Sequence, residues 1–252
     1  MKIWIDLVAG DVTLTISPKL FSTTQEIHDG ARKGQLDAMA MNVIEYRPIG
    51  DLLDSQMITA AGDAALDQYV ILAKQSSGIR QLGDLKGRRL YTLKAPRMCV
   101  APAWLFTLLE AAHYGPAEQF FGPMVTDAKF SRVVLPVFFG QADACLATKR
   151  GFDTMCELNP QVAREVKVVA ISPPMVVTFY IFRKNYQSVN REKLIRALSS
   201  SLGATAAGRQ IRTLFQFEEL AVRDAGTRAS ALDVLDAADR LRGRPATGTR
   251  KE

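Results

Sequence analysis

Short runs rich in β-branched and other apolar residues alternate along the chain with longer stretches in which apolar residues recur at helical spacing. This alternation is typical of an α/β protein. The short runs predict strands over Val12–Ile16, Asp37–Asn42, Tyr69–Ala73, Arg89–Leu93, Ala142–Ala147, Lys167–Ile171 and Val176–Phe182. The helical spacing predicts helices over Met1–Val8, Thr24–Lys33, Pro102–Ala112, Ser131–Phe139, Phe152–Leu158, Arg191–Ser201, Ala204–Thr213 and Arg228–Leu241.

Two segments of nearly the same sequence lie 106 residues apart: Gly34–Ala38 (GQLDA) and Gly140–Ala144 (GQADA). Each follows a predicted helix and opens a predicted strand, and glycine suits the left-handed backbone position that ends a helix. There are two explanations. The segments occupy equivalent places in two similar lobes, or they are separate cases of a junction that is common in α/β proteins.

Apolar residues make up 48% of the 252 residues. This is enough for a packed core, and a disordered chain is excluded. No stretch approaches the ~18–20 consecutive apolar residues of a membrane-spanning helix. The net charge of +6 is concentrated at the C-terminus, because Arg240–Glu252 alone carries +4 and the other 239 residues carry only +2. A nucleic-acid-binding face is therefore not predicted.

Few residues are available for metal or covalent chemistry. The two histidines, His28 and His113, are far apart in sequence, so neither a metal site nor a cofactor is predicted. The GxSxG, P-loop and GxGxxG motifs are absent. Cys145 and Cys156 either pair in an oxidising compartment or remain thiols, as Cys99 does. Because His113 lies about four helical turns from Cys99, we predict no catalytic residue.

Three segments resemble a known family. The stretch Tyr69–Leu90 (YVILAKQSSGIRQLGDLKGRRL) resembles a crossing segment of the solute-binding proteins of ABC transporters. In that segment a strand leaves the first lobe, a Ser-Gly-Ile turn follows, and an Asp-Leu-Lys-Gly turn introduces the second lobe. Val133–Ala144 (VVLPVFFGQADA) and Lys33–Tyr46 (KGQLDAMAMNVIEY) resemble helix-to-strand segments of the phosphate/phosphite/phosphonate-binding subfamily. The likeness covers roughly Thr13–Phe217, in the order and spacing of the family.

The resemblance implies an α/β type 2 periplasmic-binding fold, in which two lobes joined by two crossover strands grip a ligand in the cleft between them. The first lobe would comprise residues 1–74 plus 178–252, and the second residues 75–177. Hinges would lie near Ala73–Gln75 and Val177–Tyr180. Such a cleft closes on its solute by rigid-body rotation of the lobes.

The start of the chain departs from the family pattern. Family members usually begin with a secretory or lipoprotein signal and a strand that precedes the first helix. This chain starts inside the expected first helix, so we expect Met1–Val8 to be helical and the first lobe to lack its usual first strand. The resemblance implies a periplasmic location. The missing signal and strand have two explanations: either the sequence is truncated at its start, or the protein is a shortened relative with a gap in its first sheet.

Helix starts are the candidate ligand contacts. In open α/β sheets, ligands bind beyond the carboxyl ends of strands, where helix N-termini offer N–H groups and a partial positive charge. Ser22, Thr23 and Thr24 open one predicted helix, and Thr23 forms a capping-box pattern with Glu26. These hydroxyls either cap the helix only or also bind an oxyanion. Ser131 opens a second helix and leaves the same two alternatives.

A third helix start carries an arginine. Arg97, Met98 and Cys99 precede a helix whose first turn is marked by Pro102. Arg97 either binds a carboxylate or phosphoryl group bidentately or is a solvated surface residue. Met98 and Cys99 either line the site or pack in the core. Family members tend to have a Ser/Thr-Gly-rich turn here, and the Lys94–Pro102 segment differs from it.

Two further residues complete the candidate site. Tyr46 ends a strand region of the first lobe, and the resemblance places an aromatic residue of the cleft at this position. Asp143 starts a predicted strand, and it either binds a ligand amine or fixes the local backbone. Asp37 occupies the corresponding junction of the first lobe, which favours the structural role for Asp143.

The resemblance implies a solute-binding protein of an ABC importer. It would capture a small phosphonate- or phosphate-like anion without changing it, act as a monomer and work with a membrane permease. A second hypothesis is the ligand-sensing domain of a signalling or regulatory system, since the same fold serves both. A third is an enzyme built on this fold, which would need a histidine- or lysine-centred site that the sequence does not show.

Overall fold

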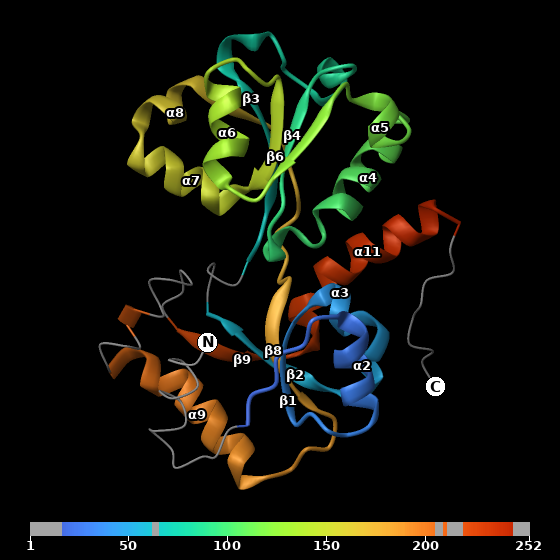
Figure 1. Cartoon of the computed structure of the whole chain (residues 1–252), viewed down its shortest axis with the longest axis vertical. Helices are drawn as coiled ribbons and strands as arrows, with labels where there is room; N and C mark the ends of the chain where they lie inside the picture. Colours follow the sequence, from blue (N-terminus) through green and yellow to red (C-terminus); the bar gives the residue numbers. More distant parts are fainter. Residues whose placement is uncertain (1–16, 62–65, 205–208, 211–218, 244–252) are drawn as a thin grey trace. The chain divides into compact units, whose positions relative to one another are not determined.

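The computed structural model describes residues 17–61, 66–204, 209–210 and 219–243, and these form two compact units (Figure 1). The first unit contains the described residues up to Leu66 together with Thr178–Ala229. The second contains Asp67–Val177 together with the described residues from Ser230 onward. Within the described residues, the chain therefore passes from one unit to the other at residues 66–67, 177–178 and 229–230. Each unit is built around one sheet.

The first unit has a four-stranded antiparallel sheet in the order β1-β8-β2-β9. Its strands are β1 (Ala38–Asn42), β2 (Leu53–Ala60), β8 (Thr178–Arg183) and β9 (Leu220–Arg223). Its helices are α2 (Thr24–Arg32), α3 (Val43–Tyr46) and α9 (Val189–Ala204), with 3-10 turns η1 (Arg47–Leu52) and η6 (Ala225–Arg228). Alternate residues of β1 and β8 are buried, as period-two strands with one covered face require.

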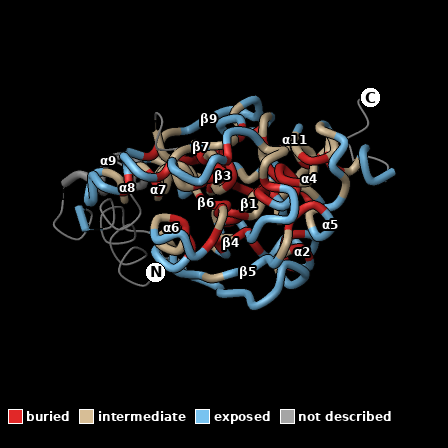
Figure 2. The backbone as a smooth tube through the Cα atoms, turned by 90° about the horizontal axis from the view of Figure 1, so that it is seen from above, coloured by how far each residue is buried: buried red, intermediate tan, exposed pale blue. Residues whose placement is uncertain are grey.

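The second unit has a five-stranded sheet in the order β5-β4-β6-β3-β7. Its strands are β3 (Tyr69–Lys74), β4 (Leu90–Leu93), β5 (Met124–Asp127), β6 (Ala144–Thr148) and β7 (Val166–Ile171). Strand β4 runs parallel to β5 and β6, whereas β3 runs antiparallel to β6 and β7. The first five residues of β3 are wholly buried, which explains why this segment is continuously apolar (Figure 2).

Helices flank the second sheet. They are α4 (Ala101–Ala111), α5 (Ala117–Phe120), α6 (Phe130–Phe138), α7 (Lys149–Leu158), α8 (Pro160–Glu165) and α11 (Ala229–Leu241), with 3-10 turns η3 (Gln75–Ser77), η4 (Leu82–Leu85) and η5 (Pro96–Met98). In Figure 1, α4 and α5 lie to one side of the sheet, and α7 and α8 lie to the other. Helix α6 buries Val133, Val134 and Val137 against the sheet, a helical spacing of apolar residues.

The two repeated segments form the same local structure in both units. Gly34 and Gly140 follow α2 and α6, and both adopt the left-handed backbone, with φ of 66° and 74°. The chain then enters β1 in the first unit and β6 in the second. Glycine ends the helix in each case because a side chain would be strained at this φ.

The structure differs from the predicted elements in several places. The expected lobe boundary at residues 74–75 falls instead at 66–67, because Tyr69–Lys74 pairs with β6 and β7 of the second sheet. The C-terminal helix, expected in the first lobe, belongs from Ser230 onward to the second unit. Strands β2, β5 and β9 and helices α3, α5 and α8 were not predicted, and Tyr46, expected at the end of a strand region, ends α3. The predicted segments Met1–Val8, Val12–Ile16 and most of Ala204–Thr213 lie outside the described residues.

Candidate functional site

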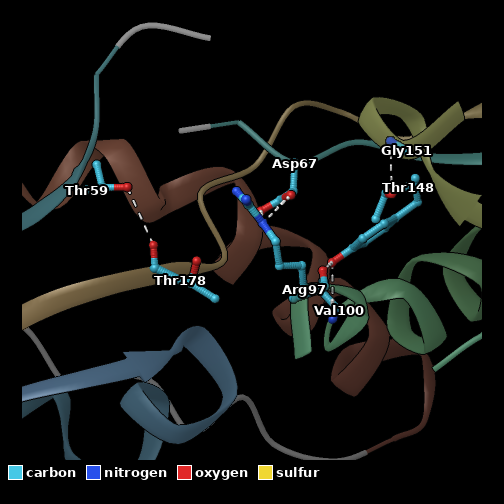
Figure 3. Close-up of polar contacts among 8 residues, drawn as sticks. Thr59, Asp67, Arg97, Val100, Thr148, Gly151 and Thr178 are labelled. Atoms are coloured by element: carbon cyan, nitrogen blue, oxygen red, sulfur yellow. Dashed lines mark hydrogen bonds and ion pairs between the residues drawn. The ribbon is translucent and has the colours of Figure 1, made fainter. Parts of the chain in front are cut away.

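Arg97 and Asp67 form the best-defined charged pair of the second unit (Figure 3). The Arg97 Nε lies 2.8 Å from Oδ1 and 3.1 Å from Oδ2 of Asp67. The Asp67 side chain is only 3% exposed, whereas that of Arg97 is 33% exposed. No hydrogen bond from the two Arg97 Nη atoms reaches any part of the chain that the structure describes. Arg97 is thus anchored through Nε, and its Nη donors remain available.

Tyr69 fixes the backbone around Arg97 by two hydrogen bonds. The buried Tyr69 hydroxyl donates to the Arg97 carbonyl at 2.9 Å and accepts from the Val100 N–H at 3.4 Å. The Tyr69 ring packs against Trp104 of α4, with ring centroids 6.2 Å apart. Burial raises the pKa of the Tyr69 phenol far above its ordinary value of 10.0, so Tyr69 stays a neutral donor. Both the side chain and the backbone of Arg97 are therefore held in place.

A second arginine lies close to the Arg97–Asp67 pair. Strand β6 pairs Thr148 with Tyr69, and the next N–H, of Lys149, donates to the Gln68 carbonyl at 2.8 Å. This register brings Arg150, in the first turn of α7, near Asp67. Burial and the charge of Arg97 lower the pKa of Arg150, against the effect of Asp67. Two guanidinium groups thus act on one carboxylate, and the region has an excess of positive charge.

The pKa of Asp67 reports the balance between burial and charge. Burial raises this pKa above its ordinary value of 3.8, and Arg97 and Arg150 lower it by a smaller amount. The positive charges of Arg97 and Arg150 therefore favour the ionised form of the buried Asp67 carboxylate. The carboxylate serves to hold Arg97, and it is too buried to be a ligand contact itself.

The N-termini of α6 and α7 lie side by side. Phe130, the first residue of α6, packs its ring directly on Gly151 of α7, where a Cβ would collide with it. The Thr148 hydroxyl caps α7 by accepting from the Gly151 N–H at 3.3 Å (Figure 3). Helix α6 has no side-chain cap, and Ser131 is its exposed second residue. Ser131 is thus an exposed hydroxyl beside uncapped backbone N–H groups.

The structure also places three other predicted residues of the second unit, Asp143, Met98 and Cys99. Asp143 accepts the Arg89 N–H at 2.9 Å and lies 3.6 Å from the Arg88 guanidinium, so its carboxylate fixes the start of β4. This is the structural alternative among the two that the sequence left open. Met98 is buried in the core and Cys99 is half-buried. Neither supplies a charge to Arg97.

In the first unit, the capping box at Thr23 is present. The Thr23 hydroxyl accepts the Glu26 N–H at 3.3 Å, and the Glu26 carboxylate accepts the N–H groups of Ser22 and Thr23. Ser22, Thr23 and Thr24 are all exposed. Thr23 therefore caps α2, as both alternatives require, and the exposed hydroxyls of Ser22 and Thr24 stand at the start of α2.

We expect Thr23→Ala to lower the free energy of unfolding by about 1 kcal/mol, the usual effect of losing an N-cap hydroxyl. Thr24→Ala is the matched control and should change stability by a few tenths of a kcal/mol at most. Chemical denaturation followed by circular dichroism measures both. Equal stabilities of the two variants would contradict the assigned capping role.

Tyr46 lies at the end of α3 and is held by an arginine that the sequence analysis did not single out. The Arg228 Nη2 donates to the Tyr46 hydroxyl at 3.0 Å, and the Arg228 guanidinium carbon lies 4.5 Å from the Tyr46 ring centre. The ring of Phe179 in β8 contacts Tyr46 edge-on, with centroids 5.6 Å apart. The expected aromatic residue is therefore half-buried in an ordered setting.

Sequence reasoning singled out Arg97 and Tyr46 as candidates but missed the residues that position them. Asp67 and Tyr69 are 30 and 28 residues from Arg97, and Arg228 is 182 residues from Tyr46. A signal for Asp67 existed, since it is an acidic residue two positions before a strand whose first five residues are apolar. No local signal marked Arg228.

Metal and thiol chemistry find little support in the described part of the chain. Within it, no group of three or more His, Cys, Asp or Glu side chains is placed to hold a metal ion. The cysteines Cys99, Cys145 and Cys156 are all described, and none forms a disulfide bond. Cys145 is wholly buried, and burial raises the pKa of its thiol, so it is an inert core residue. Among the described helices, none has the length and apolarity of a membrane span.

Residues 2–225 match the family described as ABC transporter, phosphonate, periplasmic substrate-binding protein. The chain belongs to this phosphonate-binding family. A solute-binding role in ABC transport follows from the membership, as the resemblance of the three sequence segments implied. A search of curated protein sequences gives no match.

Solved structures share the fold of this member of the phosphonate-binding family. PhnD1 from Prochlorococcus marinus, in complex with methylphosphonate, gives a TM-score of 0.67 at 11% identity, over 96% of this chain and 91% of that chain. XAC2383 from Xanthomonas citri, bound to ATP, gives 0.66 at 15% identity, over 96% and 92%. A binding-protein component of an ABC phosphonate transporter (PA3383) from Pseudomonas aeruginosa gives 0.61 at 16% identity, over 100% and 85%. The predicted type 2 periplasmic-binding fold is confirmed.

Proposed function

We propose that the protein captures a small phosphonate- or phosphate-like anion and delivers it unchanged to the permease of an ABC importer. The observation that carries this proposal is the state of Arg97. Its Nε is bonded to the buried Asp67, while its Nη atoms have no partner among the described residues. A guanidinium that is fixed in place with donors left over is suited to bind an oxyanion.

The surroundings of Arg97 favour an anion over a cation. Arg150 adds a second positive charge, and Asp67, a carboxylate that acts on both arginines, is buried and already bonded to Arg97. A ligand ammonium would therefore meet two guanidinium groups and a carboxylate that is already bonded. The N-termini of α6 and α7, which are adjacent at Phe130 and Gly151, add partial positive charge to that of the two arginines.

The proposal assigns ligand contacts to each unit separately. In the second unit they are Arg97, Ser131 and the half-buried Cys99, while Met98 serves in packing and Asp143 in fixing the backbone. In the first unit they are Ser22, Thr23, Thr24 and Tyr46. The two compact units are proposed to be the two lobes of the binding protein. We further propose that the protein acts as a monomer in the periplasm.

The test is a thermal-shift screen followed by calorimetry on the full chain. The panel contains methylphosphonate, inorganic phosphate, methanesulfonate, acetate and ATP, with sodium chloride at matched ionic strength as the control. At a hundred times its dissociation constant, a ligand that binds only the folded state stabilises it by about 2.7 kcal/mol. We expect methylphosphonate or phosphate to raise the melting temperature. The proposal fails if neither methylphosphonate nor phosphate raises it above the salt control.

A second measurement tests whether the solute is left unchanged. Phosphorus NMR of methylphosphonate incubated with the protein should show the same single signal before and after. A new phosphorus signal that grows with time would indicate chemistry and contradict a purely binding role.

A further inference from the structure

Arg228 is a buried cation in the first unit without a carboxylate partner. It is only 4% exposed, which is uncommon for an arginine unless it is paired. Among the residues that the structure describes, no carboxylate lies within 4.0 Å of the Arg228 guanidinium. A buried charge is costly unless neighbouring groups stabilise it by hydrogen bonds or charge.

The partners of Arg228 are two neutral oxygens and one aromatic ring. Nη1 donates to the Ser55 carbonyl of β2 at 3.1 Å, and Nη2 donates to the Tyr46 hydroxyl at 3.0 Å. The guanidinium carbon also lies 4.5 Å from the centre of the Tyr46 ring, within the range of a cation–π contact. Arg228 therefore fixes Tyr46 by two interactions at once.

The direction of the hydrogen bond determines what Tyr46 can do. Arginine has no acceptor, so the Tyr46 oxygen must accept from Arg228. The Tyr46 proton is therefore left for another acceptor, and the structure shows no such acceptor among the described residues. Tyr46 is half-buried, so part of its surface is exposed to solvent. Donation from a cation also makes the phenol a stronger donor, because hydrogen bonds in a chain polarise one another.

Gly50 leaves the space that this arrangement requires. A Cβ at residue 50 would lie 2.7 Å from Cζ and 2.8 Å from the hydroxyl oxygen of Tyr46, which is closer than real contacts allow. The phenol therefore packs directly on the backbone of η1. Any side chain at residue 50 would push the hydroxyl away from Arg228.

We propose that Arg228 is a positioning and specificity-determining residue, which turns the Tyr46 hydroxyl into a one-directional donor for an acceptor-only group such as an ionised phosphonate. This inference rests on the proposed function and names the part of the solute that Tyr46 recognises. The same pair disfavours a ligand ammonium, because an ammonium needs an acceptor and would meet the Arg228 charge.

The test is a double-mutant cycle on the full chain, with methylphosphonate and inorganic phosphate as probes in calorimetry. Tyr46→Phe and Arg228→Gln should each weaken binding about tenfold, as expected for one charge-assisted hydrogen bond. The double variant should be no weaker than either single variant, because Arg228 acts through Tyr46. Arg228→Lys keeps a cationic donor and should recover part of the affinity. Discrimination against 2-aminoethylphosphonate should fall in Arg228→Gln.

A second variant, Gly50→Ala, tests the inference even if Arg228→Gln fails to fold. Gly50→Ala moves the Tyr46 hydroxyl while Arg228 stays, and it should weaken binding about as much as Tyr46→Phe. Gly226→Ala is the matched control in η6, since its Cβ would meet only Asp224 Oδ1 at an ordinary 3.4 Å. It should bind like the wild type.

The outcomes separate the two proposals. If the wild type binds neither probe, the proposed function and this inference both fail. If the wild type binds but Tyr46→Phe binds equally well, only the inference fails. Fully additive losses in Tyr46→Phe and Arg228→Gln would also overturn it, because Arg228 would then act without Tyr46.

Discussion

Replacing Arg97 by alanine is expected to weaken the binding of methylphosphonate or phosphate tenfold to a hundredfold. The two Nη atoms are the donors that remain after Nε has bonded Asp67, and their loss removes charge-assisted hydrogen bonds of about 1.5–3 kcal/mol. Calorimetry on wild type and variant side by side measures the loss. Equal affinities would remove Arg97 from the site.

The same substitution is also expected to destabilise the fold, by about 3 kcal/mol. From the sequence alone, a cleft arginine packs little core and its removal should leave the fold intact. The structure changes this expectation because Asp67, only 3% exposed, would lose its ion-pair partner. Removing one member of a buried pair typically costs about 3–5 kcal/mol, and the one-third exposure of Arg97 places the effect at the lower end.

Asp67 also gives this destabilisation a pH dependence. Burial raises the pKa of Asp67 in the folded protein above its ordinary value of 3.8, so the folded state holds this proton more tightly than the unfolded state. Ionisation of Asp67 therefore lowers the free energy of unfolding at neutral pH, and this destabilisation becomes smaller as the pH falls toward 3.8. Because Arg97→Ala raises this pKa further, the stability gap to the wild type should narrow between pH 7 and pH 4.

The double variant Arg97→Ala/Asp67→Asn separates the two effects of Arg97. Without the buried charge, stability should return toward the wild-type value, while the affinity should stay low. Denaturation curves and calorimetry on the three proteins report both quantities. A double variant as unstable as Arg97→Ala would contradict the account based on the unpaired carboxylate.

Gly122→Ala is expected to lower the free energy of unfolding by about 3 kcal/mol. The Gly122 N–H donates to the Arg88 carbonyl at 2.8 Å, and the Gly87 N–H donates to the Phe120 carbonyl at 2.8 Å. A Cβ at residue 122 would lie 2.5 Å from the Gly87 carbonyl oxygen. Because that oxygen belongs to the backbone, it cannot rotate away, and overpacking of this kind reaches the upper end of the usual range.

Gly83→Ala is the matched control for Gly122→Ala. Its Cβ would meet the Tyr114 hydroxyl at 2.7 Å, but that atom ends a flexible side chain that is 39% exposed and can move aside. Thermal and chemical denaturation should show a small change for Gly83→Ala and a large one for Gly122→Ala. Similar effects in both would mean that the loop carrying Gly87 yields easily.

Local sequence signals predicted the parts of the fold that depend on neighbouring residues. Gly34 and Gly140 were recognised because a left-handed backbone after a helix favours glycine. The Thr23 capping box was recognised because its two partners are three residues apart. The turn at Arg97 was marked by Pro102, and α4 indeed begins at Ala101. Each of these signals is contained within a few residues.

The features that the sequence did not predict depend on distant partners. Strand β5 has no buried residue, so it lacks the alternating apolar pattern by which a half-buried strand is identified. The placement of β3 in the second sheet depends on pairing with β6, more than 70 residues away. Arg228 was not singled out from the sequence, because its partners Ser55 and Tyr46 are 173 and 182 residues away.

The order of the strands has a consequence for how the protein is made. Strand β8 lies between β1 and β2 in the sheet, yet it follows β2 by more than 100 residues in the sequence and is therefore translated much later. The second unit can form its sheet earlier but receives α11 only near the end of the chain. Such late, long-range pairing leaves apolar strands uncovered during synthesis and makes them prone to aggregation. Folding of the first unit should therefore wait for β8 and should gain from a chaperone that shields β1 and β2.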